Sequence, residues 1–409
     1  MQEPVERSVL FMNTKKFFPI LFALMLGGLL WSRAVLSLVN IAWLFFIIAN
    51  HHTWKPGWKK NPLLIWSVCP LLLYFFGWWQ DPLQAKNYDY LLSLLVYPVA
   101  ALAVGSIHIE ETKKICLKIW VVASVSGLLY PITWFMINSN KAIQSYGEGS
   151  SLPVFMDNDH LRFGMFLCAG FLFLVVHKTK KSLQKNLLLL FMLCIIFFLA
   201  VRTAWLMVLI TIFCFLLLPE KGATRTNTLK KIKVSLLLVA VTVLACFVFP
   251  TVQKKIAYTI YDWQQYQPGQ YHSGFSDGAR RAVNAAAWKA VTKEDRSNRG
   301  WDGVAPAISA AFEKYFPGAT PDFHWPFNQY LFWWMGSGFA GMLLFAAWLF
   351  YPVLWGWKNN NKAVIAWSLA IAASCLFESN LVFQYGIWLH AWPMALLWTQ
   401  KNQASLFTS

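Results

Sequence analysis

One arginine interrupts a long apolar run in this sequence. The segment FFLAVRTAWLMVLI, residues 197 to 210, places Arg202 inside a run that extends from Leu187 to Leu218. An ionisable side chain in such a run is costly, so it is a candidate for a functional role. Guanidinium groups form bidentate, charge-assisted hydrogen bonds to phosphate oxygens. Several arginines on one apolar cavity would therefore suit a phosphate group that is attached to a lipid.

Other ionisable residues lie at the ends of apolar segments or in one long polar segment. With Arg202 they form the set of candidate site residues: His160, Arg162, Arg280, Arg281, His324 and Glu378. The spacing of the apolar segments predicts that all of them lie on one side of the molecule. This shared sidedness favours a common site over isolated roles.

Each candidate also has a structural interpretation. Arg202 and Arg162 could anchor helix ends at a membrane surface. One residue of the Arg280-Arg281 pair could be solvated on a loop helix, and the sequence leaves open which of the two points inward. Glu378 could form a structural ion pair with one of the arginines, and His160 could be a polar residue at a helix end.

The composition is that of a polytopic membrane protein. The chain has 409 residues and a mean hydropathy of +0.46, with 57% hydrophobic and 13% charged residues, outside the range of an ordinary soluble domain. The N-terminal apolar run lacks a cleavage site and is expected to be retained as a first anchor. The seven cysteines include no CxxC pair, which argues against a disulfide framework or a thiolate metal site.

The apolar runs predict about twelve transmembrane helices in an all-α fold. Their approximate bounds are 17–31, 34–50, 63–79, 89–106, 117–137, 162–177, 187–201, 204–218, 234–250, 327–355, 363–379 and 384–399. The run 187–218 is too long for one ordinary crossing, so it is interpreted as two helices that meet near Arg202. Lysines and arginines concentrate in alternate connections, which predicts cytoplasmic N- and C-termini. The net charge of +17 is then mostly cytoplasmic anchoring, and nucleic acid is not an expected partner.

This frame divides the chain into three parts. Residues 1–250 contain helices one to nine, residues 251–326 form a long periplasmic loop, and residues 327–409 contain helices ten to twelve and a short cytoplasmic tail. The loop is expected to form a helix from about Asp277 to Thr292, opened by a Ser276/Asp277 cap, and a second from about Ala305 to Tyr315. The segment 138–160, on the same side, is turn-rich.

Several motifs, in order from about residue 150 to 390, resemble the O-antigen ligase and O-antigen polymerase superfamily. SDGARRAVNAAAWKAV followed by RGWDGVAPAI looks like the family's loop arginine and glycine turn. FNQYLFWWMGSGFAG resembles the pattern Asn-x-x-Leu and Gly-x-x-Gly, with Asn328, Leu331, Gly338 and Gly341 at the expected spacing. VRTAWL, NDHLRFG and FESNLVFQYG are similar to further segments at the outer face.

The resemblance implies a glycosyltransferase of the GT-C class in the bacterial inner membrane, with its active site under the periplasmic loop. Such enzymes take a glycan from undecaprenyl pyrophosphate and pass it to an acceptor sugar, with inversion and without a metal or nucleotide cofactor. Arg202, Arg281 and Arg162 would hold the pyrophosphate and stabilise the charge of its departure, and a histidine would accept the acceptor's proton. Arg280, Asn328, His160 and Glu378 are further candidates for substrate binding.

One position departs from the family pattern. The family's histidine directly before the Asn-x-x-Leu asparagine is replaced here by Phe327. His324 lies three residues earlier, across Trp325-Pro326, where proline favours an extended backbone, and it is the first candidate for a displaced base. His160 is the second candidate. A mechanism without a base, or a homologue that has lost activity, would also fit the missing histidine.

The predicted acceptor is lipid A core, because the long loop comes late in the chain, as in a ligase. A growing glycan, as in a polymerase, and a protein hydroxyl, as in an oligosaccharyltransferase, are also compatible with these residues. A transporter or flippase of lipid-linked sugars would need arginines at the outer face too, although transporters commonly bind near the midplane.

Overall fold

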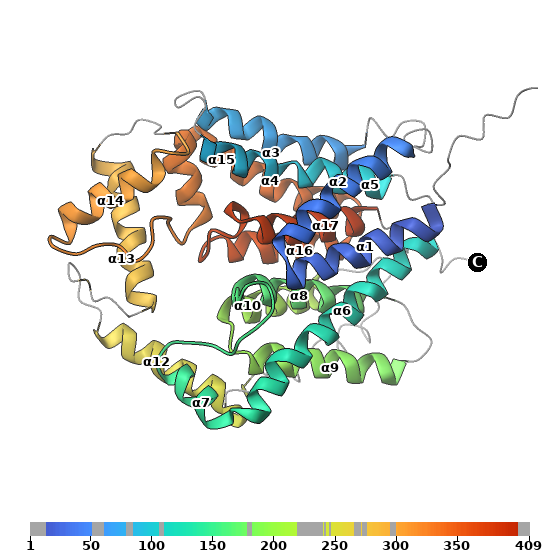
Figure 1. Cartoon of the computed structure of the whole chain (residues 1–409), viewed down its shortest axis with the longest axis horizontal. Helices are drawn as coiled ribbons and strands as arrows, with labels where there is room; N and C mark the ends of the chain where they lie inside the picture. The colour runs from blue at the N-terminus through green and yellow to red at the C-terminus, as the bar shows by residue number, and fades with distance from the viewer. Residues whose placement is uncertain are drawn as a thin grey trace, which may run out of the picture.

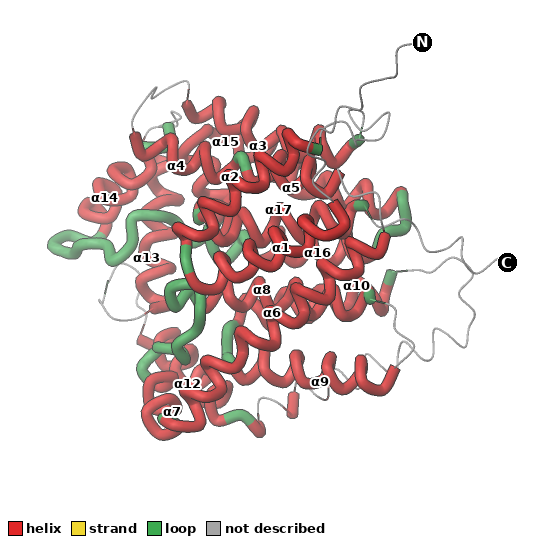
Figure 2. Tube along the Cα trace, turned by 45° about the vertical axis from the view of Figure 1, so that its right-hand side comes forward, coloured by secondary structure: helices red, strands yellow, loops and turns green. Residues whose placement is uncertain are grey.

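The protein forms a bundle of helices with a helical cap at one end (Figure 1). The computed structural model describes residues 14–50, 61–78, 85–105, 110–177, 182–218, 240, 243–244, 247–265, 271, 276–294 and 300–399. Within these residues every regular element is a helix, and none is a strand (Figure 2). The all-α fold class is therefore confirmed.

The bundle consists of mostly apolar helices of 10 to 30 residues. Their bounds are α1 Thr14–Trp31, α2 Arg33–Ala49, α3 Pro62–Trp78, α4 Ala85–Leu94, α5 Val96–Gly105, α6 Glu110–Ile137, α8 His160–Val176, α9 Ser182–Phe198, α10 Arg202–Leu217, α15 Gln329–Lys358, α16 Lys362–Ser374 and α17 Gln384–Trp398. A short 3-10 turn, η4 (Asn380–Val382), precedes α17. Helix α17 lies at the centre of the core, because all its residues from Tyr385 to Trp398 are buried.

The cap consists of helices that gather at one end of the bundle (Figure 1). They are α7 Ser139–Gly147, α12 Pro250–Gln265, α13 Ser276–Lys289 with its π-helical continuation η3 (Ala290–Glu294), and α14 Val304–Tyr315. Helices α7 and α12 pack against each other, and α13 packs against α14. The cap contains the two loop helices that the sequence predicts near Asp277–Thr292 and Ala305–Tyr315, and both are confirmed.

Two helices of the cap are not predicted by the sequence. Helix α12 begins where a loop is expected, and α7 lies in the turn-rich segment 138–160. Each is short and amphipathic, and such helices gain most of their stability from tertiary packing, so local sequence patterns indicate them poorly.

The residues that satisfy the backbone N–H groups at the start of helix α13 also differ from the prediction. Helix α13 begins at Ser276, and the backbone N–H of Asp277 donates to Asp262 of α12 at 2.8 Å. The Asp277 carboxylate is engaged elsewhere, by Arg202. The predicted Ser276/Asp277 cap is therefore wrong, because a carboxylate from the neighbouring helix satisfies this backbone donor instead.

The break inside the apolar run 187–218 is confirmed. Helix α9 ends at Phe198 and α10 begins at Arg202, with Ala200 between them at a φ of 52°. Two carbonyls at the end of α9 accept hydrogen bonds from other elements: Thr251 donates to Phe198 at 2.7 Å, and Tyr146 donates to Leu199 at 2.9 Å. Arg202 is thereby fixed at the capped end of the bundle.

Two further predicted segments differ in detail from the structure. The segment 89–106 falls within two helices, α4 and α5, which separate at Leu95 just before Pro98, a residue that lacks the backbone N–H of a continuous helix. Helix α16 ends at Ser374, so Glu378 lies in the irregular connection to α17. Most of the predicted segment 234–250 lies outside the described residues.

Helix length supports membrane spanning for only part of the predicted set. Within the described residues, two helices, Glu111–Ile137 and Gln329–Lys358, are long and apolar enough to cross a bilayer. The remaining apolar helices have 10–17 residues, and 17 residues rise about 25 Å, less than a bilayer core of about 30 Å. The count of twelve transmembrane helices is therefore not confirmed.

Trp301 anchors the cap to the bundle. It follows Gly300, which adopts a φ of 69°, and its side chain is 3% exposed. The indole N–H donates to the carbonyl of Tyr74 on α3 at 2.9 Å. Gly77 and Gly336 lie against the ring, and a Cβ atom at either position would come within 2.5 Å of it. The glycine turn of the sequence therefore positions a tryptophan between α3 and α15.

Candidate functional site

Arg202 is held by a carboxylate from the cap. Its two terminal nitrogens donate to the two oxygens of Asp277, each at 2.6 Å, and one of them also donates to Thr259 at 3.2 Å. Burial opposes ionisation of Asp277, but the hydrogen bonds and charge of Arg202 outweigh it, so the pKa of Asp277 lies below its ordinary value. The pair joins α10 of the bundle to α13 of the cap and fixes the plane of the guanidinium.

Arg280 follows Asp277 by about one helical turn and faces the same region. Its guanidinium forms an ion pair with Glu378, which is 3% exposed in the connection between α16 and α17. The same guanidinium lies 4.7 Å from the ring centre of Phe327. These contacts direct Arg280 toward the bundle.

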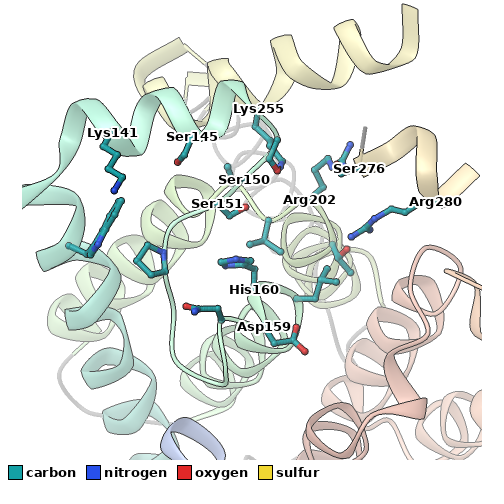
Figure 3. Close-up of a pocket in the computed structure, with 18 residues that line it drawn as sticks. Lys141, Ser145, Ser150, Ser151, Asp159, His160, Arg202, Lys255, Ser276 and Arg280 are labelled. Carbon is teal, nitrogen blue, oxygen red and sulfur yellow. The ribbon is translucent and has the colours of Figure 1, made fainter. Parts of the chain in front are cut away.

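A cavity of about 670 Å³ lies at the junction of α7, α8, α10, α12 and α13, and we call it the capped cavity. Five of its lining side chains are nitrogen bases or cations: Lys141, His160, Arg202, Lys255 and Arg280. Ser145, Ser150, Ser151 and Ser276 add hydroxyl groups. Figure 3 shows His160 in the middle, with Lys141 on one side and Arg202 and Arg280 on the other. One carboxylate, Asp159, also lines the cavity, and it is paired with Arg162. The remaining lining is suited to an anion with several oxygens, with an imidazole beside it.

Lys255 is a site residue that sequence reasoning missed. It is 8% exposed, and its ammonium group donates to the carbonyl of Gly149 at 2.8 Å. Burial lowers the pKa of Lys255 to about 8, and the charges of Arg202 and Arg280 act in the same direction. The signal is present in the sequence, since the buried positions of α12 recur with helical spacing, but the helix itself was not predicted.

A second cavity of about 480 Å³ adjoins the first and shares Arg202, Thr203 and Arg280 with it. We call it the adjacent cavity. Its lining is more aromatic and apolar, with Trp263, Phe327, Leu206, Leu376 and Phe377, and it also includes Arg281. The guanidinium of Arg281 lies 4.1 Å from the ring centre of Trp263. Arg202 and Arg280 are therefore accessible from two differently lined cavities.

The structure brings some predicted residues together at these cavities. His160, Arg202 and Arg280 line the capped cavity, and Arg281 lines the adjacent one. Glu378 is not among the lining residues of either, but it holds Arg280. The convergence expected from the sequence therefore occurs for these residues.

Three more predicted residues have different environments. Arg162 is 6% exposed and is engaged by Asp159 at 3.2 Å and by the carbonyl of Ser379 at 3.3 Å. The Asn328 side chain caps α15 by accepting from Tyr330 and Leu331, each at 3.0 Å. His324 is exposed, 3.2 Å from the Ser309 hydroxyl, and is not among the residues that line these two cavities.

Comparison with known proteins does not supply a function. No protein-family model matches this sequence, and no curated protein matches it. Within the described part of the chain, no group of three or more His, Cys, Asp or Glu side chains is arranged to hold a metal ion. The resemblance to the O-antigen ligase superfamily stays a prediction, and a function has to be inferred from the geometry of the site.

Proposed function

We propose that this protein is a bacterial inner-membrane glycosyltransferase that transfers a glycan from undecaprenyl pyrophosphate to a periplasmic acceptor. The observation that carries the proposal is the capped cavity, where Arg202, Lys255 and Arg280 come from three elements and face one space beside His160. A pyrophosphate presents several oxygens and more than one negative charge, which matches two oriented guanidiniums and an ammonium.

A membrane location is supported by the surface of the bundle. Large apolar side chains are exposed on many of its helices, among them Ile20, Phe45, Ile65, Leu129, Leu187 and Leu354. Such a surface is unfavourable in water and is typical of contact with lipid. In the proposed arrangement the twelve predicted segments cross the membrane, both termini are cytoplasmic, and the cap is periplasmic.

The two ion pairs give the arginines their proposed roles. Asp277 and Glu378 fix the guanidiniums of Arg202 and Arg280 without filling the cavity, so donors remain for phosphate oxygens. Fixed donors of this kind stabilise charge as it develops on a leaving group. Lys255 adds a positive charge whose burial strengthens its interaction with an anion.

The proposed transfer is a single displacement. The acceptor hydroxyl oxygen forms a bond to the anomeric carbon as the bond from that carbon to the pyrophosphate oxygen breaks. The electron pair leaves with the carrier pyrophosphate, between Arg202 and Arg280, and His160 accepts the hydroxyl proton. His160 is preferred over His324 because it lines the same cavity as the arginines, whereas His324 contacts Ser309 on an exposed part of the cap.

The proposed acceptor is lipid A core, as in a ligase. The lining of the adjacent cavity is suited to a large, amphipathic substrate, because Arg281 lies there beside the aromatic rings of Trp263 and Phe327. This cavity also shares Arg202 and Arg280 with the capped cavity. A polymerase or a protein glycosyltransferase would use the same donor chemistry and differ only in the acceptor. A transporter would bind the donor without cleaving it.

The test is transfer from a synthetic undecaprenyl pyrophosphate glycan to purified lipid A core by the full chain. We expect Arg202→Ala and Arg280→Ala to lower kcat roughly 100-fold or more, and His160→Ala to lower it by a similar factor. Arg33→Ala is the matched control, since Arg33 is also paired with an aspartate, Asp157 at 2.8 Å, but is 58% exposed.

Each result assigns a different role or function. Loss of activity in His324→Ala with retention in His160→Ala would assign the base to His324. Transfer to a second donor glycan or to a peptide hydroxyl, but not to lipid A core, would identify a polymerase or a protein glycosyltransferase. Donor binding that requires Arg202 and Arg280, without cleavage under any acceptor condition, would contradict the transferase and favour a transporter.

A further inference from the structure

A groove of about 410 Å³ lies at the end of the bundle opposite the cap, and we call it the α6–α9 groove. It is formed by α6, the last turn of α8 and the first turns of α9. Six of its lining residues define its character: Leu117, Lys118, Val121, Leu174, His177 and Lys185. In Figure 1, α6 and α9 both extend from this end toward the cap.

Positive charge gathers at the mouth of this groove. Lys118 is exposed on α6, and Lys114 lies one turn before it on the same face. The charges of Lys118, Lys185 and Lys114 all act on His177, which ends α8. No carboxylate is among the residues that line the groove. The mouth therefore attracts an anion.

Lys185 is held in place by main-chain groups. Its ammonium donates to the carbonyls of Val175 at 2.9 Å and His177 at 2.7 Å, at the end of α8, where helix carbonyls lack intrahelical donors. An ammonium has three donors, so this arrangement leaves one for a ligand. The lysine is thus positioned by neutral carbonyl acceptors and not by a carboxylate.

The groove becomes apolar toward the middle of the bundle on all three helices. On α6, Val121 follows Lys118 by about one turn; on α9, Leu188 follows Lys185; and on α8, Leu174 precedes His177. Val122, another apolar residue that lines the groove, is 63% exposed. A basic mouth above an apolar channel matches a molecule with an anionic head and a hydrocarbon tail.

We propose that the α6–α9 groove binds an anionic phospholipid. The phosphate lies among Lys118, Lys185 and His177, and one acyl chain follows Val121 and Leu188 toward the middle of the bilayer. Free phosphate would use only the mouth and would leave the apolar channel open to water. The proposal depends on residence in a membrane but not on the transfer reaction, and the positive charge of the mouth agrees with the cytoplasmic leaflet.

The test is native mass spectrometry of the full chain in a neutral detergent, titrated with phosphatidylglycerol or with phosphatidylcholine of the same acyl chains. We expect phosphatidylglycerol to bind at least about fivefold more tightly, and Lys118→Ala to weaken it about fivefold, the effect of one lysine near an anionic headgroup. Val121→Trp fills the channel and should weaken both lipids. Lys358→Ala removes an exposed lysine on α15 and should leave binding unchanged.

Two results would overturn the proposal. Equal binding of the two lipids by the wild type would mean that the basic mouth does not recognise the headgroup. Equal losses in Lys118→Ala and Lys358→Ala would mean that the lipid responds to net charge and not to this groove. Lys118 is exposed, so its substitution does not disturb packing and decides the question even if Val121→Trp fails to fold.

Discussion

The capped cavity and the α6–α9 groove are both basic and each contains a lysine held by a carbonyl, but only the capped cavity has arginines paired with carboxylates. In the capped cavity, Arg202 and Arg280 are each paired with a carboxylate from another element. In the groove, Lys185 is held by carbonyls and Lys118 is exposed. An arginine paired in this way has a fixed plane, whereas a lysine is a point charge that imposes no plane on its ligand. The difference indicates oriented binding of one ligand at the cap and looser attraction of an anion at the groove.

The two regions also differ in what assembles them. The groove is made by three helices of the bundle that are close in sequence. The capped cavity needs α7, α8 and α10 together with α12 and α13, which enter the fold through the long segment after α10. Its geometry therefore depends on the docking of the cap, and the groove does not. Three predictions test this contrast.

The largest expected effect comes from Trp301, the residue that joins the cap to α3 and α15. Trp301→Ala should destabilise the protein by about 4 kcal/mol, because a buried tryptophan and its contacts are lost. The rate of glycan transfer should also decrease in this variant. Binding of phosphatidylglycerol in the α6–α9 groove should persist in the fraction that stays folded. Thermal unfolding in detergent, the transfer assay and native mass spectrometry measure the three quantities.

Trp288→Ala is the control for this prediction. Trp288 belongs to α13 in the same cap but is 54% exposed, so its removal should cost much less stability. The idea that Trp301 anchors the cap is wrong if the two variants lose the same stability, or if Trp301→Ala impairs the groove as strongly as the capped cavity.

The second prediction uses the pH dependence of Lys255. Its pKa of about 8 in the folded protein is below the ordinary lysine value of 10.5, so the side chain loses its charge as pH rises through 8. Affinity of the capped cavity for pyrophosphate, measured by calorimetry, should fall severalfold between pH 7 and pH 9. Because the folded state binds fewer protons than the unfolded chain between pH 8 and 10.5, stability should rise over that interval.

As pH rises, pyrophosphate affinity should fall while the stability of the protein should rise. These opposite changes distinguish deprotonation of Lys255 from a general effect of pH. Lys255→Arg keeps a positive charge across the range, so the decrease in pyrophosphate affinity should be absent in this variant. A decrease of the same size in Lys255→Arg would show that another group is responsible. In that case Lys255 would be a structural residue that ties α12 to Gly149.

The contrast between the two regions also explains what the sequence could predict. Apolar length located the helices of the bundle, and the charge inside one run located the break before Arg202, because both depend on local composition. The sequence also placed Arg202 and Arg280 on one side of the molecule. Their ion-pair partners were harder to predict from the sequence. Asp277 has the sequence context of a residue that caps a helix, but its carboxylate binds Arg202, 75 positions away.

Residues of the cap were harder to predict because tertiary contacts decide their roles. Lys255 can be recognised as a site residue only once helix α12 is known, and the stability of α12 depends on its packing against α7. His324 is favoured as a base by its short distance in sequence to Phe327, but in the structure it is exposed and contacts Ser309. His160, far away in sequence, enters the capped cavity because α8 begins there. Short sequence separation is a poor guide to spatial proximity here.

The smallest expected effect concerns Asn328, and it tests whether this residue stabilises helix α15 or binds the substrate. Asn328 is a candidate for substrate binding in the sequence, but its side chain accepts from two backbone N–H groups at the start of α15. Asn328→Ala should therefore cost about 1 kcal/mol of stability, the usual contribution of such a cap, whereas Asn328→Asp should retain most of it. Pyrophosphate affinity should be the same in both variants once the folded fractions are matched, because Asn328 is not among the residues that line the two cavities. An affinity loss in Asn328→Ala at full folding would place this residue in the binding site and extend the capped cavity toward α15.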